Sequence, residues 1–329
     1  MLDFDGAIDV YTTAPQSKES TAERYFAEVS EAARWSDGCA GMLIYSDNSI
    51  IDAWLVAQTV LLASKTLRPL VAVQPIYMHP YAAAKMVASL AYLHHRAIAL
   101  NMIAGGFSND YPALGDTTPH DDRYARLLEY TQIIQRLLGG DIVTFEGTYY
   151  HVHNLRLAPT LPDELLPRIL MSGSSPAGRN AAMSVNAIGV EYPKPPGEVS
   201  NEDVPSGYTR GIRIGIISRQ TDAEARRIAA ERFPPNRRGK LLRDFATKVS
   251  DSQWHHQLSE TKDAGAYTLE PWNYGYCSCP YLIGDHASVA EAIAGYLRLG
   301  FQTFILDIPR TEDDVICAGI AFEKALALV

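Results

Sequence analysis

The sequence predicts a closed (β/α)8 barrel, and three observations lead to this fold class. Short apolar segments alternate with helical segments along most of the chain of 329 residues. The apolar segments show no regular change between polar and apolar residues, as expected for parallel strands that are buried on both faces. The runner-up is a doubly wound open sheet, which would normally carry GxGxxG after its first strand, and the sequence lacks that motif.

The strands are expected at the short apolar runs, of which GMLIY at 41–45 is an example. In chain order we expect strands at 6–12, 41–45, 69–75, 97–105, 168–173, 187–192, 211–218 and 301–307. Between and after them we expect helices at about 20–36, 51–65, 81–95, 120–138, from Ala177 onward, 221–233, 288–300 and 311–328. This alternation predicts one barrel domain over residues 1–329.

Three segments interrupt the simple repeat. Residues at about 141–158 alternate in polarity around Glu146-Gly147, which predicts an inserted hairpin. Residues 193–209 form a loop where a helix is due, and residues at about 234–280 form a long irregular insertion before the short strand YLIG. Insertions in barrels usually lie at the catalytic mouth, so we expect these to lie at the carboxyl ends of the strands and part of 234–280 to act as a lid.

The composition is that of a globular protein and limits the classes of partner. Hydrophobic residues make up 47% of the chain, charged residues 20%, and the net charge is −9. The only run rich in Lys and Arg is RFPPNRRGKLLR at 232–243. We therefore expect neither a nucleic-acid partner nor a membrane span.

The four cysteines, Cys39, Cys277, Cys279 and Cys317, are too few and too irregular for a disulfide framework. Cys277 and Cys279 are one residue closer than in a zinc knuckle and have no second pair. We expect free thiols in a reducing cytoplasm and no metal site.

The stretch RILMSGSSPAG at 168–178 takes a buried strand through Gly173, Ser174 and Ser175 directly into a helix. A helix start offers unpaired N–H groups, and the serine hydroxyls add donors, which suits a phosphate. The other interpretation is an ordinary loop with a serine as the N-cap.

Further polar residues follow the expected strands. Tyr45 and Asp47 follow the second strand and Tyr192 ends the sixth, where they are candidates for substrate binding. His79 follows the third strand and is either an acid/base group or a loop residue. His151 and His153 lack a third ligand, so we expect them to be structural.

Several stretches together resemble the bacterial luciferase-like family, and specifically its alkanesulfonate monooxygenase branch. They occur in the same order and spacing and cover most of the chain after about residue 40. The stretches are SIIDAWLVAQ (49–58), ALNMIAGG (99–106), HDDRYARLLEY (120–130), GGDIVTFEGTYYHVHNLRL (139–157), MSGSSPAG (171–178), RIGIISRQTDAEA (213–225) and LIGDHASVAEAIAGYLRLGFQTFILDIP (282–309).

The resemblance implies a TIM barrel that binds reduced flavin at its C-terminal mouth. By position it implies that Gly173, Ser174 and Ser175 hold the FMN phosphate, with help from Arg123 and Tyr124. It also implies that Asn101 and Gly105 lie along the isoalloxazine. The phosphate interpretation of GSS is therefore favoured over the simple cap.

The sequence departs from the sulfonate enzymes at their catalytic residues. Their active-site cysteine falls at Ile50, the histidine of their seventh strand at Gly215, and the tyrosine after their last strand at Ile308. The arginine of the seventh strand is kept as Arg213. We therefore expect the flavin site to be kept, with Arg213 as an anion-stabilising cation, and the substrate to differ from an alkanesulfonate.

The expected function is that of a two-component FMNH2-dependent monooxygenase, which takes reduced FMN from a separate flavin reductase and oxygenates a small or carrier-bound metabolite. Arg213 and His79 are the candidate catalytic residues. The expected assembly is a homodimer or homotetramer. A non-catalytic flavin-binding barrel and an F420-dependent oxidoreductase of the same fold are the alternatives.

Overall fold

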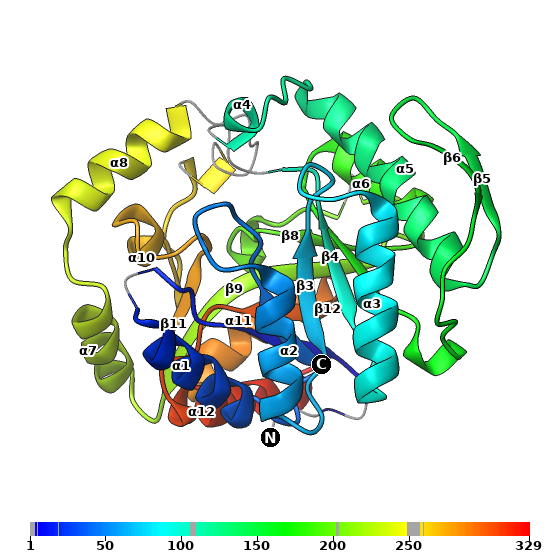
Figure 1. The fold of residues 1–329 in the computed structure, drawn as a ribbon. Coiled ribbons are helices and arrows are strands. Elements are labelled where there is room, and N and C mark those ends of the chain that lie inside the picture. Colours follow the sequence, from blue (N-terminus) through cyan, green and yellow to red (C-terminus); the bar gives the residue numbers. More distant parts are fainter. Residues whose placement is uncertain are drawn as a thin grey trace. The chain divides into compact units, whose positions relative to one another are not determined.

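The computed structural model describes residues 4, 6–18, 20–105, 110–201, 204–248, 257–258 and 260–329. Within this part of the chain, the barrel strands follow the hydrogen-bonded order β12-β1-β2-β3-β4-β7-β8, and β9 pairs with both β8 and β12. This cyclic order confirms the predicted (β/α)8 barrel. Figure 1 colours the strands and helices by their position in the sequence. The strands are β1 (Asp9–Thr13), β2 (Gly41–Ile44), β3 (Pro69–Val73), β4 (Ala99–Ile103), β7 (Ile169–Ser172), β8 (Ile188–Glu191), β9 (Arg210–Arg219) and β12 (Phe301–Leu306).

The predicted helices are present, and side-chain caps explain several of their starts. Asp52 accepts a hydrogen bond from the Trp54 N–H at 2.9 Å, and Thr311 forms a capping box with Asp314. The helices are α1 (Ala22–Trp35), α2 (Ala53–Ala63), α3 (Pro80–His94), α5 (His120–Leu138), α6 (Pro176–Ser184), α7 (Asp222–Arg232), α11 (His286–Arg298) and α12 (Glu312–Leu326). Among the described residues, no helix combines the length and apolar character needed to cross a bilayer.

The chain divides into two compact units. Unit 1 comprises Met1–Thr13, Trp35–Ala40 and Val190–Val329, and unit 2 comprises Ala14–Arg34 and Gly41–Gly189. The expectation of one domain over residues 1–329 stays a prediction.

Unit 2 is built on β2, β3, β4 and β7, which lie side by side in parallel. Leu70 of β3 is paired with Ala99 of β4, and Leu100 is paired with Ile169 of β7. Helix α2 packs on β2 and β3, α5 packs on β4, and α3 contacts both of these helices. Residues such as Leu70 and Leu100 are fully buried, as expected for strands covered on both faces.

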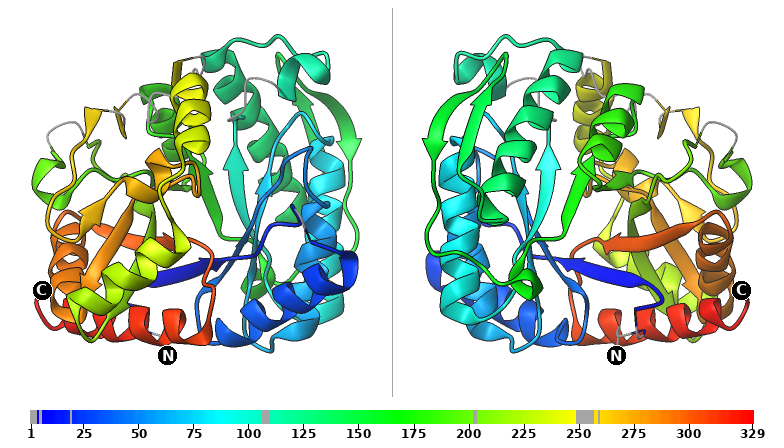
Figure 2. Two further views of the ribbon diagram at one scale, coloured as in Figure 1. Left: turned by 90° about the vertical axis from the view of Figure 1, so that its left-hand side faces the viewer. Right: turned by 90° about the vertical axis from the view of Figure 1, so that its right-hand side faces the viewer.

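The predicted hairpin within 141–158 is confirmed as β5 (Val143–Glu146) and β6 (His151–Leu155). It lies against α5, as Figure 2 shows. The carboxylate of Glu129 on α5 accepts hydrogen bonds from the backbone N–H groups of Thr148, Tyr149 and Tyr150, at 2.7, 2.8 and 3.1 Å. One acidic side chain therefore holds the hairpin turn to the helix.

Unit 1 contains β1, β9 and β12, together with a small extension of the sheet. β11 (Tyr281–Asp285) pairs in parallel with the second half of β9, and β10 (Tyr267–Thr268) pairs antiparallel with β11. The expected strand YLIG is β11. The expected loop at 193–209 holds only a 3-10 turn, η2 (Pro196–Glu198), in its described part.

The insertion at 234–280 is more regular than its sequence suggests. It contains α8 (Arg237–Lys248) and α10 (Glu270–Asn273), which pack on each other, as well as β10. Residues 249–256 and 259 of this insertion lie outside the described part of the chain. The expected lid function of the insertion stays a prediction.

Candidate active site

The GSS stretch joins the end of β7 to the start of α6 in unit 2. Ser175 is the N-cap of α6, and its hydroxyl oxygen accepts a hydrogen bond from the Gly178 N–H at 3.1 Å. Pro176 occupies the first helical position and has no N–H to donate. The N–H of Ala177 and the hydroxyl of Ser174 have no partner within the described residues. They are the donors that the helix start offers to an anion.

Tyr124 on α5 explains why position 173 is a glycine. Gly173 has a φ of +153°, and a Cβ added to it would collide with the hydroxyl of Tyr124. That hydroxyl donates to the carbonyl oxygen of Ser172 at 3.4 Å, and Ser175 lies close enough to lower its pKa in part. Burial raises the pKa of Tyr124, so its phenol stays protonated. The structure therefore brings Gly173, Ser175 and Tyr124 together, as predicted.

Asn101 lies at the same edge of unit 2. Its side chain is buried in β4, and its Oδ1 accepts a hydrogen bond from the Ser172 hydroxyl at 2.9 Å. Ser172 immediately precedes Gly173, so Asn101 fixes the strand end from which the GSS stretch begins. The structure therefore also brings Asn101 to the predicted cradle.

Gly105 and Arg123 belong to a second cluster in unit 2, around Tyr111. Gly105 has a φ of +126°, and a Cβ there would overlap the Tyr111 hydroxyl. The buried guanidinium of Arg123 lies over the Tyr111 ring, 4.8 Å from its centroid. Residues 106–109, between Gly105 and α4 (Asp110–Ala113), lie outside the described part.

His79, Tyr45 and Asp47 follow their strands, as predicted. His79 is the N-cap of α3, where its Nδ1 accepts a hydrogen bond from the Tyr81 N–H at 3.1 Å. Burial lowers the pKa of His79, and the neutral ring that caps the helix leaves only Nε2 for proton transfer. Asp47 is half-buried and accepts from the Ser49 N–H at 2.6 Å, which holds its own turn. Tyr45 is half-buried.

Arg213 is buried in unit 1 and belongs to a network of polar side chains. Its Nη2 lies 3.0 Å from Asp307 Oδ1, and its Nη1 donates to Thr13 Oγ1 at 3.2 Å. The Thr13 hydroxyl donates in turn to the carbonyl oxygen of Leu306 at 2.6 Å. These contacts direct the guanidinium to the carboxyl ends of β1 and β12, which is where barrels build their sites.

Tyr281 completes the network from β11. Its hydroxyl donates to Asp307 Oδ2 at 2.7 Å, so Asp307 bridges Tyr281 and Arg213. Burial and the Asp307 charge raise the pKa of Tyr281 well above its usual value. A Cβ on Gly215 would collide with the Tyr281 ring. The space beside the strand at Gly215, where the sulfonate enzymes carry their histidine, is therefore filled by an aromatic ring from another strand.

Tyr192, Cys277 and Cys279 surround this network. Burial raises the pKa of the half-buried Tyr192, and the nearby Arg213 acts in the opposite direction. The two thiols lie with an Asp307 oxygen in a group whose ligand atoms are all within 4.8 Å of one another. Both oxygens of Asp307 are engaged by Arg213 and Tyr281, so we assign the group to the hydrogen-bond network and not to a metal. All four cysteines are free, as predicted.

A cleft in unit 1 borders the network. Its lining includes Thr12, Phe233, Tyr281, Asp307 and Arg310. Tyr281 and Asp307 therefore connect the buried Arg213 to a surface opening of the same unit.

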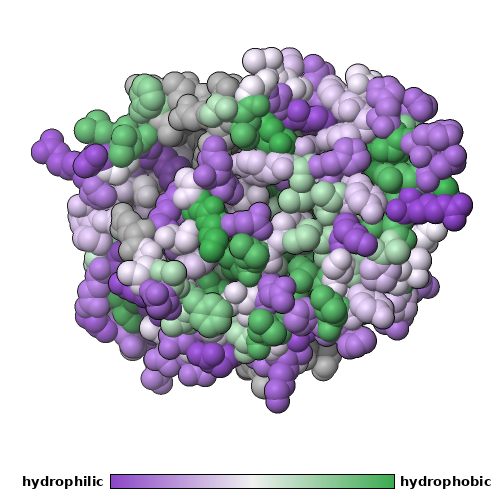
Figure 3. Space-filling view, viewed as in Figure 1, coloured by the Kyte–Doolittle hydropathy of each residue, from purple (hydrophilic) through white to green (hydrophobic). Residues whose placement is uncertain are grey.

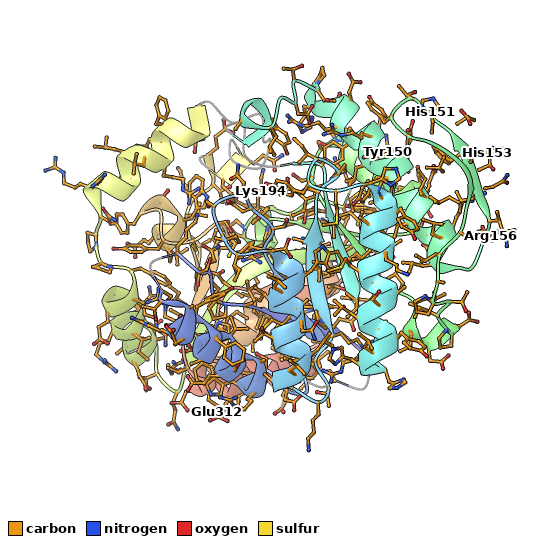
Figure 4. The ribbon with its side chains drawn as sticks, in the orientation of Figure 1. Tyr150, His151, His153, Arg156, Lys194 and Glu312 are labelled. Carbon is orange, nitrogen blue, oxygen red and sulfur yellow. The ribbon has the colours of Figure 1, made fainter. Side chains whose placement is uncertain are left out.

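His151 and His153 stand apart from both clusters. Both are exposed on β6, on the hairpin beyond α5, as Figure 4 shows. The Asn154 side chain is hydrogen bonded to His153 Nε2 at 2.9 Å. The structural interpretation of these two histidines stays a prediction.

Sequence reasoning missed Thr13, Tyr281 and Asp307. Gly215 carried the only local signal, because a glycine inside an apolar strand often marks the close approach of another group. Nothing in the sequence says that the approaching group comes from Tyr281, which is far away along the chain.

The comparisons with known proteins decide the family. A model described as luciferase-like monooxygenase matches residues 8–303. The chain belongs to the luciferase-like monooxygenase family. This confirms the resemblance found in the sequence, and the protein is a flavin-dependent monooxygenase.

A curated relative covers nearly the whole chain. The BtrO monooxygenase of Niallia circulans, named for its action on 4-(gamma-L-glutamylamino)butanoyl-BtrI acyl-carrier protein, is 34% identical over 323 residues. The match covers 94% of this chain and 94% of the relative.

Solved structures of the same fold belong to proteins whose names give different cofactors. The oxygenating constituent of 3,6-diketocamphane monooxygenase from Pseudomonas putida, in complex with FMN, has a TM-score of 0.69 at 17% identity over 96% of this chain and 98% of that chain. The F420-dependent tetrahydromethanopterin reductase of Methanopyrus kandleri has a TM-score of 0.64 at 13% identity over 95% and 97% of the two chains. At these identities the likeness shows the fold alone.

Proposed function

We propose that the protein is a two-component FMNH2-dependent monooxygenase that oxygenates an acyl group carried as a thioester on a carrier protein. The observation that carries the proposal is the 34% identity, over 94% of both chains, to an enzyme named for a carrier-bound acyl substrate. A separate flavin reductase supplies the reduced FMN. The assembly is a homodimer or homotetramer in the reducing cytoplasm, where the four free cysteines persist.

The residues of the GSS cradle suit the FMN phosphate. Ser174, Ser175 and the Ala177 N–H supply donors at the start of α6, where the helix dipole favours an anion by about 0.3–1 kcal/mol. Gly173 lets the Tyr124 hydroxyl approach the loop closely, because a Cβ at this position would collide with it. Asn101 and Gly105 lie along the isoalloxazine, and Arg123 adds positive charge. When bound, the reduced flavin supplies the electrons that activate dioxygen.

The polar network of unit 1 suits a charged group of the substrate. Arg213 is the cation, Asp307 holds its guanidinium in place, and Tyr281 fixes the other oxygen of Asp307. Tyr45, Asp47 and Tyr192 contact the acyl group, and His79 exchanges protons through Nε2. The ring of Tyr281 and the packed cluster around Phe233 limit the water that reaches the network through the bordering cleft.

A substrate comparison tests the proposal. The protein is mixed with chemically reduced FMN, dioxygen and 4-(gamma-L-glutamylamino)butanoyl-BtrI, and the acyl group is analysed by mass spectrometry. We expect the carrier-bound acyl group to gain one oxygen atom, and the free acid to remain unchanged. A hydride transfer from reduced F420 without dioxygen, in place of oxygenation with FMNH2, would contradict the proposal.

Arg213→Lys tests the role of the network in turnover. Lysine cannot contact Asp307 and Thr13 through a planar fork, so at least one charged hydrogen bond, worth about 1.5–3 kcal/mol, is lost. We expect kcat/KM for the carrier-bound thioester to fall about tenfold or more. Arg226→Lys on α7, where Arg226 forms an exposed ion pair with Asp222, is the control and should keep full activity. Equal activity of the two variants would remove Arg213 from the site.

A further inference from the structure

Helix α8 has an exposed apolar face. Leu241, Leu242 and Phe245 are 70%, 60% and 67% exposed. Their spacing places them on one side of the helix, and Arg238 lies on the same side. Figure 3 shows hydrophobic side chains gathered over α8, with strongly hydrophilic ones beside them.

The opposite side of α8 is firmly attached to unit 1. Arg243 donates from Nη2 to the carbonyl oxygen of Cys277 at 2.7 Å and from Nε to that of Trp272 at 3.1 Å. Its guanidinium also lies over the Trp272 ring, 5.1 Å from the centroid. A Cβ on Gly239 would collide with the carbonyl oxygen of Tyr274. The helix is therefore seated through one face, and the apolar residues lie on the other.

The exposed face is also positively charged. Arg237 and Arg238 are exposed, and neither forms an ion pair with a described residue. The chain as a whole has a net charge of −9, so these cations stand out on an acidic protein. Unpaired cations beside exposed leucine and phenylalanine suit a partner whose surface is acidic with an apolar centre.

A single residue, Cys277, links α8 to the polar network of the active site. Arg243 binds the carbonyl oxygen of Cys277, and the Cys277 thiol belongs to the group that includes Asp307. Asp307 in turn holds Arg213. A partner docked on α8 would thus deliver a tethered group next to the residues that the proposed function assigns to the substrate.

We propose that the exposed face of α8, formed by Arg237, Arg238, Leu241, Leu242 and Phe245, docks the acidic carrier protein that bears the acyl substrate. This inference rests on the proposed function, because it takes the carrier-bound thioester as the substrate. The cations speed the encounter and make it dependent on salt, and the apolar residues hold the docked carrier.

Charge reversal on α8 tests the docking surface. The variant Arg237→Glu/Arg238→Glu is compared with the control Lys65→Glu/Arg68→Glu, which makes the same change in net charge at exposed positions of unit 2. A second variant, Leu242→Ser/Phe245→Ser, removes the apolar part. The measurements are the KM for 4-(gamma-L-glutamylamino)butanoyl-BtrI, the KM for the pantetheine thioester of the same acyl group, and the Kd of fluorescently labelled BtrI carrying its phosphopantetheine arm.

We expect both α8 variants to raise the KM for the carrier-bound thioester and the Kd of labelled BtrI at least about tenfold. The KM for the pantetheine thioester should stay within about twofold, and the control should behave as the unsubstituted protein. High salt should raise the Kd of labelled BtrI for the unsubstituted protein much more than its Kd for Arg237→Glu/Arg238→Glu.

Three results would overturn the docking proposal and leave the proposed function standing. Oxygenation of the carrier-bound thioester with an unaltered KM in both α8 variants would show that the carrier docks elsewhere. An equal rise in the KM for the pantetheine thioester would show that α8 acts as a lid. A change of oligomeric state in light scattering would show that the face contacts a second copy. If BtrI bound through α8 but no carrier thioester were oxygenated, the docking proposal would stand and the proposed function would fail.

Discussion

Replacing Asp307 with alanine should lower the free energy of unfolding by about 3–5 kcal/mol, because it leaves the Arg213 guanidinium buried without a counter-charge. The two side chains are only 4% and 10% exposed, so water cannot take over the role of the carboxylate. The Tyr281 hydroxyl loses its acceptor at the same time. Urea unfolding followed by circular dichroism measures the loss.

The matched control for Asp307→Ala is a substitution, Glu231→Ala, that breaks an exposed ion pair. Arg227 and Glu231 on α7 are paired at 2.6 Å, but their side chains are 60% and 62% exposed. Glu231→Ala should therefore cost no more than about 0.5 kcal/mol. If Asp307→Ala and Glu231→Ala lowered the free energy of unfolding equally, the buried network would not exist in the folded chain.

A double substitution separates the stability of the network from its function. Arg213→Met together with Asp307→Leu removes both charges, and we expect it to recover most of the stability that Asp307→Ala loses. Oxygenation should not recover, because the cation that binds the substrate is absent. Recovery of activity together with stability would contradict the role of Arg213.

The second large effect is expected at the flavin cradle. Ser174→Ala with Ser175→Ala removes two hydroxyl donors to a dianion, each worth about 1.5–3 kcal/mol as a charged hydrogen bond. The Kd for reduced FMN, measured by anaerobic titration, should rise at least about tenfold. Loss of the Ser175 cap should also lower the free energy of unfolding by about 0.5–2 kcal/mol.

Ser184→Ala on the same helix is the control for the cradle. The Ser184 hydroxyl is exposed and donates only to the carbonyl oxygen of Asn180, at 2.8 Å. This substitution should leave the Kd for reduced FMN unchanged. A double variant at Ser174 and Ser175 that binds reduced FMN as tightly as Ser184→Ala would remove the GSS stretch from the cofactor site.

The barrel could be predicted because each of its strands and helices is specified by residues that are close together in the sequence. Each strand is a short apolar run, and several helices have side-chain caps close to their first residue, such as Asp52 and the capping box at Thr311. The hairpin at 141–158 was equally clear from its alternation. The insertion at 234–280 was expected to be irregular because its composition is mixed, and the structure shows that α8 is held there by Arg243 and Gly239, which contact distant backbone atoms.

The candidate site could be predicted only in part. The GSS stretch is contiguous, so its strand end and helix start were visible in the sequence, and its contact with Tyr124 agrees with that interpretation. The other members of the Arg213 network come from three other strands or strand ends, and no periodicity links Thr13, Tyr281 and Asp307. His79 is a helix cap, a role that its position before Pro80 allowed but did not require.

The origin of the inserted oxygen atom shows whether the protein oxygenates a carrier-bound acyl group with dioxygen and reduced FMN. The protein, reduced FMN and 4-(gamma-L-glutamylamino)butanoyl-BtrI are mixed under isotopically labelled dioxygen, and the mass of the acyl group is measured. The proposed function predicts a product that carries one labelled oxygen atom and that does not form without reduced FMN. A product without the label, or oxidation of FMNH2 with no modified acyl group on any carrier thioester, would contradict it.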